Sequence, residues 1–332
     1  MRVPLSFGSS VQVFFTEHLK RNKGLSVETI ASYRDTFRLL LRYLESSAHV
    51  APHEVEVADL DAPRILSFLD YLECERHNAV RSRNIRLAAI RSFFRFLSIR
   101  DPESLAIATR VLAIPVKREA RRLVGYLTKP EIKAILAAPN RACWSGRRDH
   151  ALLLTLYNTG ARVSEVAALT ASQVRLGVNP FIHLHGKGRK DREVPLWRTT
   201  ARVLNAWIDE VGPVAHDRTF PSARGSALTR DGVSYLLSHA VNAAKATCPS
   251  LTTKRVTPHV IRHTTAMHLL QSGVDISVIA LWLGHASIET THMYLEADLG
   301  MKERALAALA PSPVAARRFR GDDALLQFLA RL

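Results

Sequence analysis

Apolar residues recur at three- and four-residue intervals through the first hundred positions of this sequence. Such intervals place apolar side chains on one face of a helix, so they predict helices over residues 11–22, 26–47, 62–76 and 79–100. Ser26 can cap the second of these, although Thr29 replaces the acid of a full capping box. The first part of the chain is therefore predicted to be a four-helix unit.

This regular pattern stops in the segment LAIPVKREARRLVG, residues 112–125. Pro115 and Gly125 interrupt the helical periodicity, and four cations stand against one acid. These features indicate a basic linker that can contact phosphate groups.

The sequence beyond the linker mixes helical and strand patterns. Helical spacing returns over 128–138 and 148–160, and two β-prone runs in FIHLHGKGRKDREVPL, residues 181–196, flank Gly186 and Gly188 as in a hairpin. Helices are expected to fill most of the remainder. The fold class predicted is mainly α with a small β-hairpin or sheet, in the α+β class.

The length of the chain favours two domains, because 332 residues exceed what one core usually fills. We expect a helical domain over 1–111, the linker over 112–125, a second domain over 126–310 and a tail over 311–332. In the tail, Leu325, Phe328, Leu329 and Leu332 form one stripe at helical spacing.

The charge balance points to a polyanionic partner. Forty-six Lys and Arg against thirty Asp and Glu give a net charge of +16, which favours nucleic acid first and an anionic membrane surface second. Residues 76–100 hold seven arginines and no acid. A solvated helix face is the alternative interpretation of that run.

Cysteine usage and hydropathy indicate the compartment. Cys74, Cys143 and Cys248 lie far apart and form neither a CxxC pair nor a zinc spacing, which favours a reducing environment. No stretch approaches the ~20 apolar residues of a membrane span. We expect a cytoplasmic protein with no membrane partner.

The segment around residues 257–262 predicts an anion site. Thr257 can cap a helix whose first position is Pro258, and His259 and Arg262 then share one face near the helix N-terminus. Free N–H groups and the dipole attract anions there, and a guanidinium matches phosphate. Each residue taken singly is as compatible with an ordinary surface position.

The next segment carries further polar groups among apolar ones. Asp275 is expected to cap a helix that stops at Gly284, and His285 follows at a corner. Ser287 can cap another helix, which carries Tyr294. By itself Tyr294 is equally compatible with a core tyrosine.

Two earlier segments add candidate residues. In NTGARVSEVAALT, Gly160 ends a long apolar helix, and Arg162 and Glu165 open the next at a three-residue spacing. Lys187 stands at the tip of the predicted hairpin. His183 and His185 could suggest a metal, but third and fourth ligands are not visible, so structural or phosphate contacts are favoured.

The ordered set resembles the active-site signature of the tyrosine recombinases, the phage-integrase and Xer-like family. The resemblance rests on the segments ARVSEV, HGKGRKDREVPL, HVIRHT and LGHASIETTHMY, and it covers nearly the whole chain. It implies a SAM-like core-binding domain and a catalytic domain that form a C-shaped clamp on duplex DNA. The residues that carry it are Arg162, Lys187, His259, Arg262, His285 and Tyr294.

The resemblance implies strand cleavage by transesterification. Tyr294 would attack the scissile phosphate, form a 3'-phosphotyrosyl link and release a 5'-hydroxyl. Arg162 and Arg262 would bind the nonbridging oxygens as their charge grows. The family needs no metal and no nucleotide cofactor, and the sequence has no Walker loop and no HExxH motif.

The remaining roles are implied in the same way. Lys187 would protonate the leaving 5'-oxygen, His259 would transfer a proton to or from the tyrosine, and His285 would hydrogen-bond a phosphate oxygen. Glu165 would orient Arg162 or brace the helix.

Basic residues outside this set are the candidates for DNA contact. Phosphate contacts supply affinity and base contacts define the site. The candidates are Arg81, Arg83, Arg86, Arg91, Lys117, Arg118, Arg121, Arg122, Arg189 and Lys190.

The implied partners are specific sites on double-stranded DNA and further copies of the chain, assembled as a tetramer on two sites. The tail stripe is expected to dock either on a neighbouring protomer or on its own domain. Whether accessory recombinases or DNA-bending proteins take part stays open.

Three alternatives remain at this stage: a type IB topoisomerase-like enzyme, a catalytically silent DNA-binding regulator and a metal nuclease. The complete set of six residues disfavours the second, and missing ligands disfavour the third. The expected role is integration, excision or transposition of a mobile element.

Overall fold

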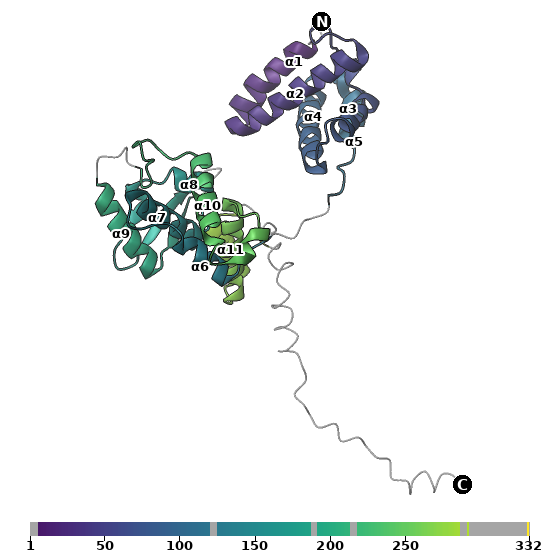
Figure 1. Cartoon of the computed structure of the whole chain (residues 1–332). Helices are drawn as coiled ribbons and strands as arrows, with labels where there is room; N and C mark the ends of the chain where they lie inside the picture. Colours follow the sequence, from purple (N-terminus) through teal and green to yellow (C-terminus); the bar gives the residue numbers. More distant parts are fainter. Residues whose placement is uncertain are drawn as a thin grey trace. The chain divides into compact units, whose positions relative to one another are not determined.

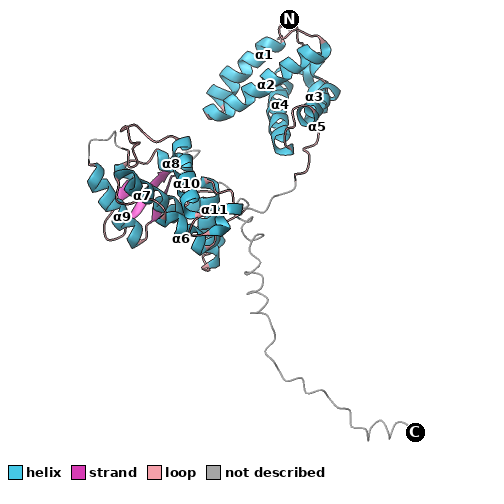
Figure 2. Ribbon diagram, in the orientation of Figure 1, coloured by secondary structure: helices cyan, strands magenta, loops and turns pink. Residues whose placement is uncertain are grey.

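The computed structural model describes residues 6–119, 125–186, 191–212, 218–285, 291 and 331. The chain divides into two compact units, Met1–Arg121 and Arg122–Leu332 (Figure 1). In the described residues, strands occur only in the second unit, and helices make up most of both units (Figure 2).

The four helices predicted for the first unit are confirmed, and the structure adds others. Ser26 caps α2 by accepting a hydrogen bond from the backbone N–H of Thr29. The 105–113 helix was not predicted; it follows a short 3-10 turn in which Pro102 takes the first position. The elements are α1 (Phe7–Val13), a π-helical continuation (Phe14–Asn22), α2 (Val27–Ala48), a 3-10 turn (Val57–Leu60), α3 (Ala62–Cys74), α4 (Val80–Arg100), a 3-10 turn (Pro102–Ser104) and α5 (Leu105–Ala113).

Helix α4 organises the core of the first unit, because α2, α3 and α5 all pack against it. Phe93 is fully buried at this junction. Its ring centroid lies 5.3 Å from that of Phe14 and 5.3 Å from that of Phe37, both near edge-to-face. These are favourable aromatic geometries, so three sequence-distant segments are joined at one side chain.

The second unit contains the predicted helices and hairpin, together with a short third strand. The sheet is antiparallel with order β1-β2-β3, and Leu184 pairs with Arg192 across β2 and β3. Its elements are α6 (Lys129–Ala137), α7 (Trp144–Thr159), α8 (Val163–Ala167), a 3-10 turn (Ala171–Gln173), β1 (Val174–Arg175), β2 (Phe181–His185), β3 (Asp191–Pro195), α9 (Arg198–Val211), α10 (Arg230–Ala244), a 3-10 turn (Pro249–Thr253), α11 (Pro258–Gln271) and α12 (Ile276–Leu283).

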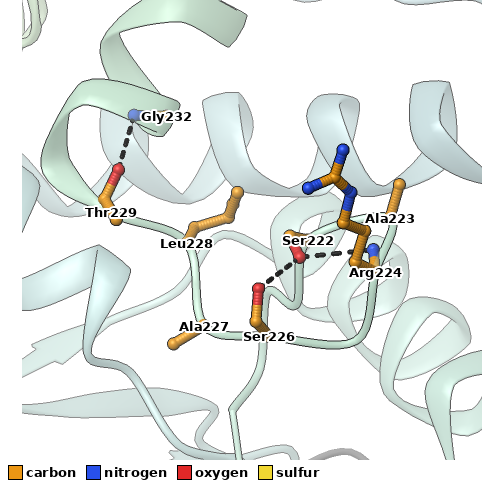
Figure 3. A pocket seen from close by; sticks show the side chains of 8 residues that line it. All are labelled: Ser222, Ala223, Arg224, Ser226, Ala227, Leu228, Thr229 and Gly232. Carbon is orange, nitrogen blue, oxygen red and sulfur yellow. Dashed lines mark hydrogen bonds between the residues drawn. The ribbon is translucent and has the colours of Figure 1, made fainter.

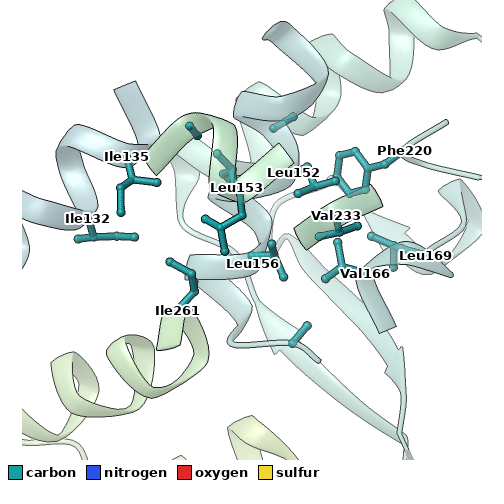
Figure 4. Packing of buried hydrophobic residues seen from close by; sticks show 14 of the residues in the cluster. Ile132, Ile135, Leu152, Leu153, Leu156, Val166, Leu169, Phe220, Val233 and Ile261 are labelled. Atoms are coloured by element: carbon teal, nitrogen blue, oxygen red, sulfur yellow. The ribbon is translucent and has the colours of Figure 1, made fainter. Parts of the chain in front are cut away.

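Helix α7 runs through the core of the second unit. Its Leu152, Leu153 and Leu156 are buried among Val166 and Ile261 from α8 and α11 (Figure 4). Removing such side chains from water is the main stabilising contribution, at about 25 cal/mol per Å² of apolar surface. This packing holds α7 in place within the core.

The end of α7 lies against the end of α12. Gly160 closes α7 with a left-handed backbone, φ +58°, and a Cβ added there would lie 2.6 Å from Leu283 Cδ2. Only glycine fits both the backbone angle and the space. Two helix C-termini therefore meet at Gly160.

In the part of the chain that the structure describes, no helix combines the length and apolar character needed to cross a bilayer. Cys74, Cys143 and Cys248 are free thiols.

The first prediction concerns the independence of the two units. Phe93→Ala should cost about 3–5 kcal/mol, because it removes a buried aromatic side chain. Native-state hydrogen exchange followed by mass spectrometry should then show faster exchange in α1–α5 and no change in α7 or α11. Ile99→Ala is the matched control on α4, since Ile99 is 80% exposed, and should change neither. Equal acceleration in α7 would mean that the units unfold together.

Candidate active site

The candidate site is built around the carboxyl end of α12. Asp275 caps the other end, accepting a hydrogen bond from Ser277 N at 2.8 Å, and Gly284 terminates the helix with φ +65°. Both boundaries were predicted. The final carbonyls of a helix have no intrahelical donors, so their partners must come from elsewhere.

Three arginines supply those partners. Arg192 Nε donates to Trp282 O at 2.9 Å, Arg262 Nη2 to Leu283 O at 2.6 Å and Arg162 Nη2 to Gly284 O at 3.1 Å. Three consecutive carbonyls thus accept from three different guanidinium groups. Positive charge is also favoured at a helix C-terminus by the dipole.

Arg262 joins the two helix ends. Besides Leu283 O, it donates through Nη1 to Gly160 O, the carbonyl at the end of α7, at 2.6 Å. The residue is 5% exposed. Its orientation is therefore fixed by backbone atoms of two rigid elements.

Glu165 connects the other two arginines. Its carboxylate accepts from Arg162 Nη1 at 2.8 Å, from Arg162 N at 2.8 Å and from Arg192 Nη2 at 2.7 Å. Burial alone would raise the pKa of Glu165, but the hydrogen bonds and charge of Arg192 and Arg162 outweigh it and hold that pKa below its ordinary value. An ionised Glu165 thus orients both guanidinium groups.

His285 lies beside this cluster. Burial, followed by the charges of Arg262, Arg162, His263 and Arg192, lowers the pKa of His285 to about 4. Its Nδ1 lies 2.8 Å from the hydroxyl oxygen of Thr291, which is fully buried. The imidazole is therefore neutral at pH 7.

The first two turns of α11 contribute two more histidines. Thr257 caps it, accepting a hydrogen bond from Val260 N at 3.4 Å, and Pro258 occupies the first position as predicted. His259 is exposed. Burial and the nearby charges of His259 and Arg262 lower the pKa of His263 to about 4.

Several candidate residues lie outside the described residues. The hairpin strands end at His185 and resume at Asp191, so the tip is not described. The candidates concerned are Lys187, Tyr294, Arg121, Arg122, Arg189 and Lys190, with Ser287 and the tail stripe.

Sequence reasoning missed Arg192 and His263. Strand alternation could have identified the first, since Arg192 and Val194 share a face of β3 and Val194 is buried. An arginine at such a position needs a carboxylate partner, and Glu165 is that partner. For His263, adjacency to Arg262 was the available signal.

Two of the arginines predicted to contact DNA also make contacts within the first unit. Arg83 is 6% exposed, lies 3.8 Å from Glu73 and donates to Asn84 and to Pro115 O. Arg86 Nη1 donates to Ser32 O at 3.0 Å, bracing α4 against α2. These contacts give Arg83 and Arg86 a role in packing, and their contact with DNA stays a prediction.

The remaining described candidates keep solvent access. Arg81 and Arg118 are exposed and Arg91 is partly exposed. Lys117 Nζ lies 3.0 Å from Glu73, and its backbone is held by Asn84 through two hydrogen bonds. The start of the predicted linker is therefore attached to α4.

The candidate residues do not line the described surface cavities. A cavity of about 370 Å³ lies before α10, where Ser222 Oγ is 2.8 Å from Ser226 Oγ and Thr229 caps the helix (Figure 3). A second, of about 180 Å³, is lined by Cys143, Asp149 and His239 among others.

Family profiles cover both units. That of the Phage integrase family matches residues 125–300, and that of the Phage integrase N-terminal SAM-like domain matches residues 13–100. The chain belongs to the phage integrase family.

Individual relatives agree with this assignment. The chain is 49% identical to the integrase/recombinase y4rC of Sinorhizobium fredii over 98% of each protein. It is 32% identical to the tyrosine recombinase XerD of Staphylococcus saprophyticus, over 84% of this chain and 91% of that protein.

Solved structures show the same fold. XerH recombinase bound to its difH substrate has a TM-score of 0.71 at 22% identity, covering 90% of this chain and 84% of that one. A lambda integrase tetramer bound to a Holliday junction has a TM-score of 0.60 at 17% identity, covering 87% and 77%. The predicted fold class and the predicted family are confirmed, and tyrosine recombinases cleave and rejoin DNA strands.

The second prediction tests the Glu165 clamp. Glu165→Gln should cost about 3–5 kcal/mol at pH 7, because it leaves the buried guanidinium group of Arg192 and the partly exposed one of Arg162 without their anion. The pKa of Glu165 is lower in the folded protein than in the unfolded chain. Its contribution to the free energy of unfolding is therefore fully present above the unfolded pKa of about 4.3, and it is lost as the pH falls through the folded pKa. Urea unfolding followed by tryptophan fluorescence measures the loss of stability and its dependence on pH. The signal reports on the second unit, because all four tryptophans lie there.

The control for this prediction is Glu210→Gln. Arg147 and Glu210 form an equally bidentate pair, at 2.8 and 2.7 Å, but on the surface. Such pairs contribute about 0–1 kcal/mol. Equal losses of stability in the two variants would contradict a buried ionic interaction at Glu165. So would a stability difference between the unaltered protein and Glu165→Gln that grows as the pH falls.

Proposed function

We propose that this protein is a site-specific DNA recombinase that cuts and rejoins strands through a 3'-phosphotyrosyl intermediate on Tyr294, without metal or ATP. The observation that carries the proposal is the convergence of Arg162, Arg262 and neutral His285 at the end of α12. The family membership supplies the reaction class.

The two arginines are suited to bind a scissile phosphodiester. Both guanidinium groups are oriented by backbone carbonyls before any DNA arrives. Planar forks match phosphate oxygens, and donors fixed in advance need no reorganisation as charge builds up. Losing one such donor typically costs about 3–4 kcal/mol of transition-state stabilisation.

His285 is assigned a hydrogen-bonding role. A neutral imidazole presents one N–H donor and one acceptor nitrogen. Burial, together with the nearby guanidinium groups, lowers the pKa of His285 and keeps it neutral at physiological pH, so it adds no charge to the site. In the proposal it donates to a phosphate oxygen.

The position of Thr291 supports Tyr294 as the nucleophile. Thr291 contacts His285 at 2.8 Å, and Tyr294 follows three residues later. Three residues span at most about 11 Å, and we therefore propose that the phenol reaches the cluster. Lys187 is proposed to protonate the leaving 5'-oxygen and His259 to exchange a proton with the tyrosine.

The nucleophile prediction uses a suicide duplex that traps cleaved DNA. Tyr294→Phe should bind DNA with unchanged affinity but form no covalent adduct, because it lacks the attacking oxygen. Tyr235→Phe is the matched control, since Tyr235 is 69% exposed on α10, and should form the adduct with EDTA present. A persistent adduct in Tyr294→Phe would refute the assignment.

The DNA partner is proposed to be a pair of specific sites bound by a tetramer. The lambda integrase tetramer bound to a Holliday junction supports an assembly of this kind. Arg81, Arg91 and Arg118 are proposed phosphate contacts. The role proposed is integration, excision or transposition of a mobile element in the cytoplasm, and the similarity to an integrase/recombinase supports it.

A fourth prediction concerns the tail. Deleting residues 321–332 should weaken assembly on paired sites at least tenfold more than binding to a single site, if the tail docks on a neighbouring protomer. Gel-shift and analytical ultracentrifugation experiments on one-site and two-site DNA measure single-site binding and assembly on paired sites. Equal losses would show that the tail packs on its own domain.

A further inference from the structure

One face of the β2–β3 hairpin carries four polar groups that the proposed reaction does not use. His183 and His185 alternate with the buried Ile182 and Leu184, so they project from the outer face of β2. In β3, Asp191 and Glu193 project to the same face. The register pairs His185 with Asp191 and His183 with Glu193.

The side chains on this face lie close together. His185 Nδ1 is 3.0 Å from Asp191 Oδ1, and His183 Nε2 is 3.5 Å from Asp191 Oδ2. The two imidazole centroids are 4.8 Å apart. One ligand atom from each of these three residues lies within 4.8 Å of the others.

We propose that His183, His185 and Asp191 bind one divalent transition-metal ion of the zinc class. Tetrahedral zinc with ligands at about 2.0–2.1 Å requires ligand atoms about 3.3 Å apart. His185 Nδ1 lies 3.0 Å from Asp191 Oδ1 and His183 Nε2 lies 3.5 Å from Asp191 Oδ2. Both separations are close to that spacing but involve different carboxylate oxygens, so side-chain rotation is needed to bring the three ligands around one ion. Imidazole and carboxylate ligands favour zinc, cobalt, nickel and copper over magnesium or calcium.

Glu193 supplies a carboxylate that can support the proposed ligand His183. Metal-binding histidines usually donate their other ring N–H to a carboxylate, which fixes the ring. His183 Nδ1 faces Glu193 Oε1 at 3.8 Å, so a small side-chain rotation makes that hydrogen bond. Glu193 is therefore the supporting carboxylate, and a water completes the fourth position, as in three-ligand zinc sites.

The proposed ligands are accessible from solvent. All the groups are partly or largely exposed, so an ion can enter directly from solvent.

The proposed ion stands apart from strand cleavage. Arg192, which holds Glu165, shares a strand face with Val194 and so faces away from Asp191 and Glu193. Cleavage that survives EDTA is therefore compatible with this site. The sequence alone showed only two ligands, because the third becomes adjacent only through the hairpin register.

The test is cobalt and zinc binding by the full chain without DNA, so its outcome does not depend on the recombinase proposal. Calorimetry should give one site, and Co²⁺ should show d–d absorption bands. Asp191→Asn and His185→Gln, both exposed and compatible with folding, should each weaken binding at least 100-fold. Glu193→Gln should weaken it about 10–100-fold, as loss of a supporting carboxylate does.

The matched control is His53→Gln. His53 and Glu54 form an exposed histidine–carboxylate pair at 3.8 Å. Among the described residues, no third metal-ligating side chain joins this pair, so the loss of His53 should leave the metal affinity unchanged. If the unaltered protein binds no more metal than a His183→Gln/His185→Gln double variant with the same circular dichroism spectrum, the four groups form only an ion-pair network and the proposal is overturned.

Discussion

The candidate site depends on the carbonyl groups at the end of α12, which have no hydrogen-bond donors within their own helix. Trp282, Leu283 and Gly284 each present an oxygen that the short helix cannot satisfy. Leaving such groups buried and unpaired would cost about 1–3 kcal/mol each. Arginines from three separate elements satisfy them, so a structural requirement of one helix positions the charges of the site.

The charge of this cluster explains its chemistry. Arg162 and Arg192 share the carboxylate of Glu165, and Arg262 is held by the carbonyls of Gly160 and Leu283. Carbonyl groups hold the guanidinium groups without neutralising them, and the low pKa of His285 follows from burial and the charges of these arginines. In the proposed function, a phosphodiester brings negative charge to the guanidinium groups. Because their orientation is already fixed, they are preorganised in that proposal for the additional charge of a transition state.

Local rules predicted the fold well, and tertiary contacts account for the differences. Thr257, Asp275 and Gly284 mark helix boundaries because capping depends on neighbours in sequence. The roles of Arg192 and Arg83 depend on which strand or helix face is buried, and composition does not encode that. Likewise, the pairing of His185 with Asp191 follows from hairpin register. Order along the chain identified the six candidate residues, whereas their supporting partners required the folded structure.

The most direct measurement is the titration of the His285 ring by NMR in DNA-free protein labelled at histidine, with the signal assigned by a His285→Gln variant. If His285 lies beside the arginine cluster, its midpoint falls near pH 4. Binding of duplex DNA to the Tyr294→Phe protein should raise that midpoint, because the phosphodiester offsets the guanidinium charge. A midpoint near the ordinary histidine value of about 6.5, unchanged by DNA, would contradict the convergence of these groups on one phosphate.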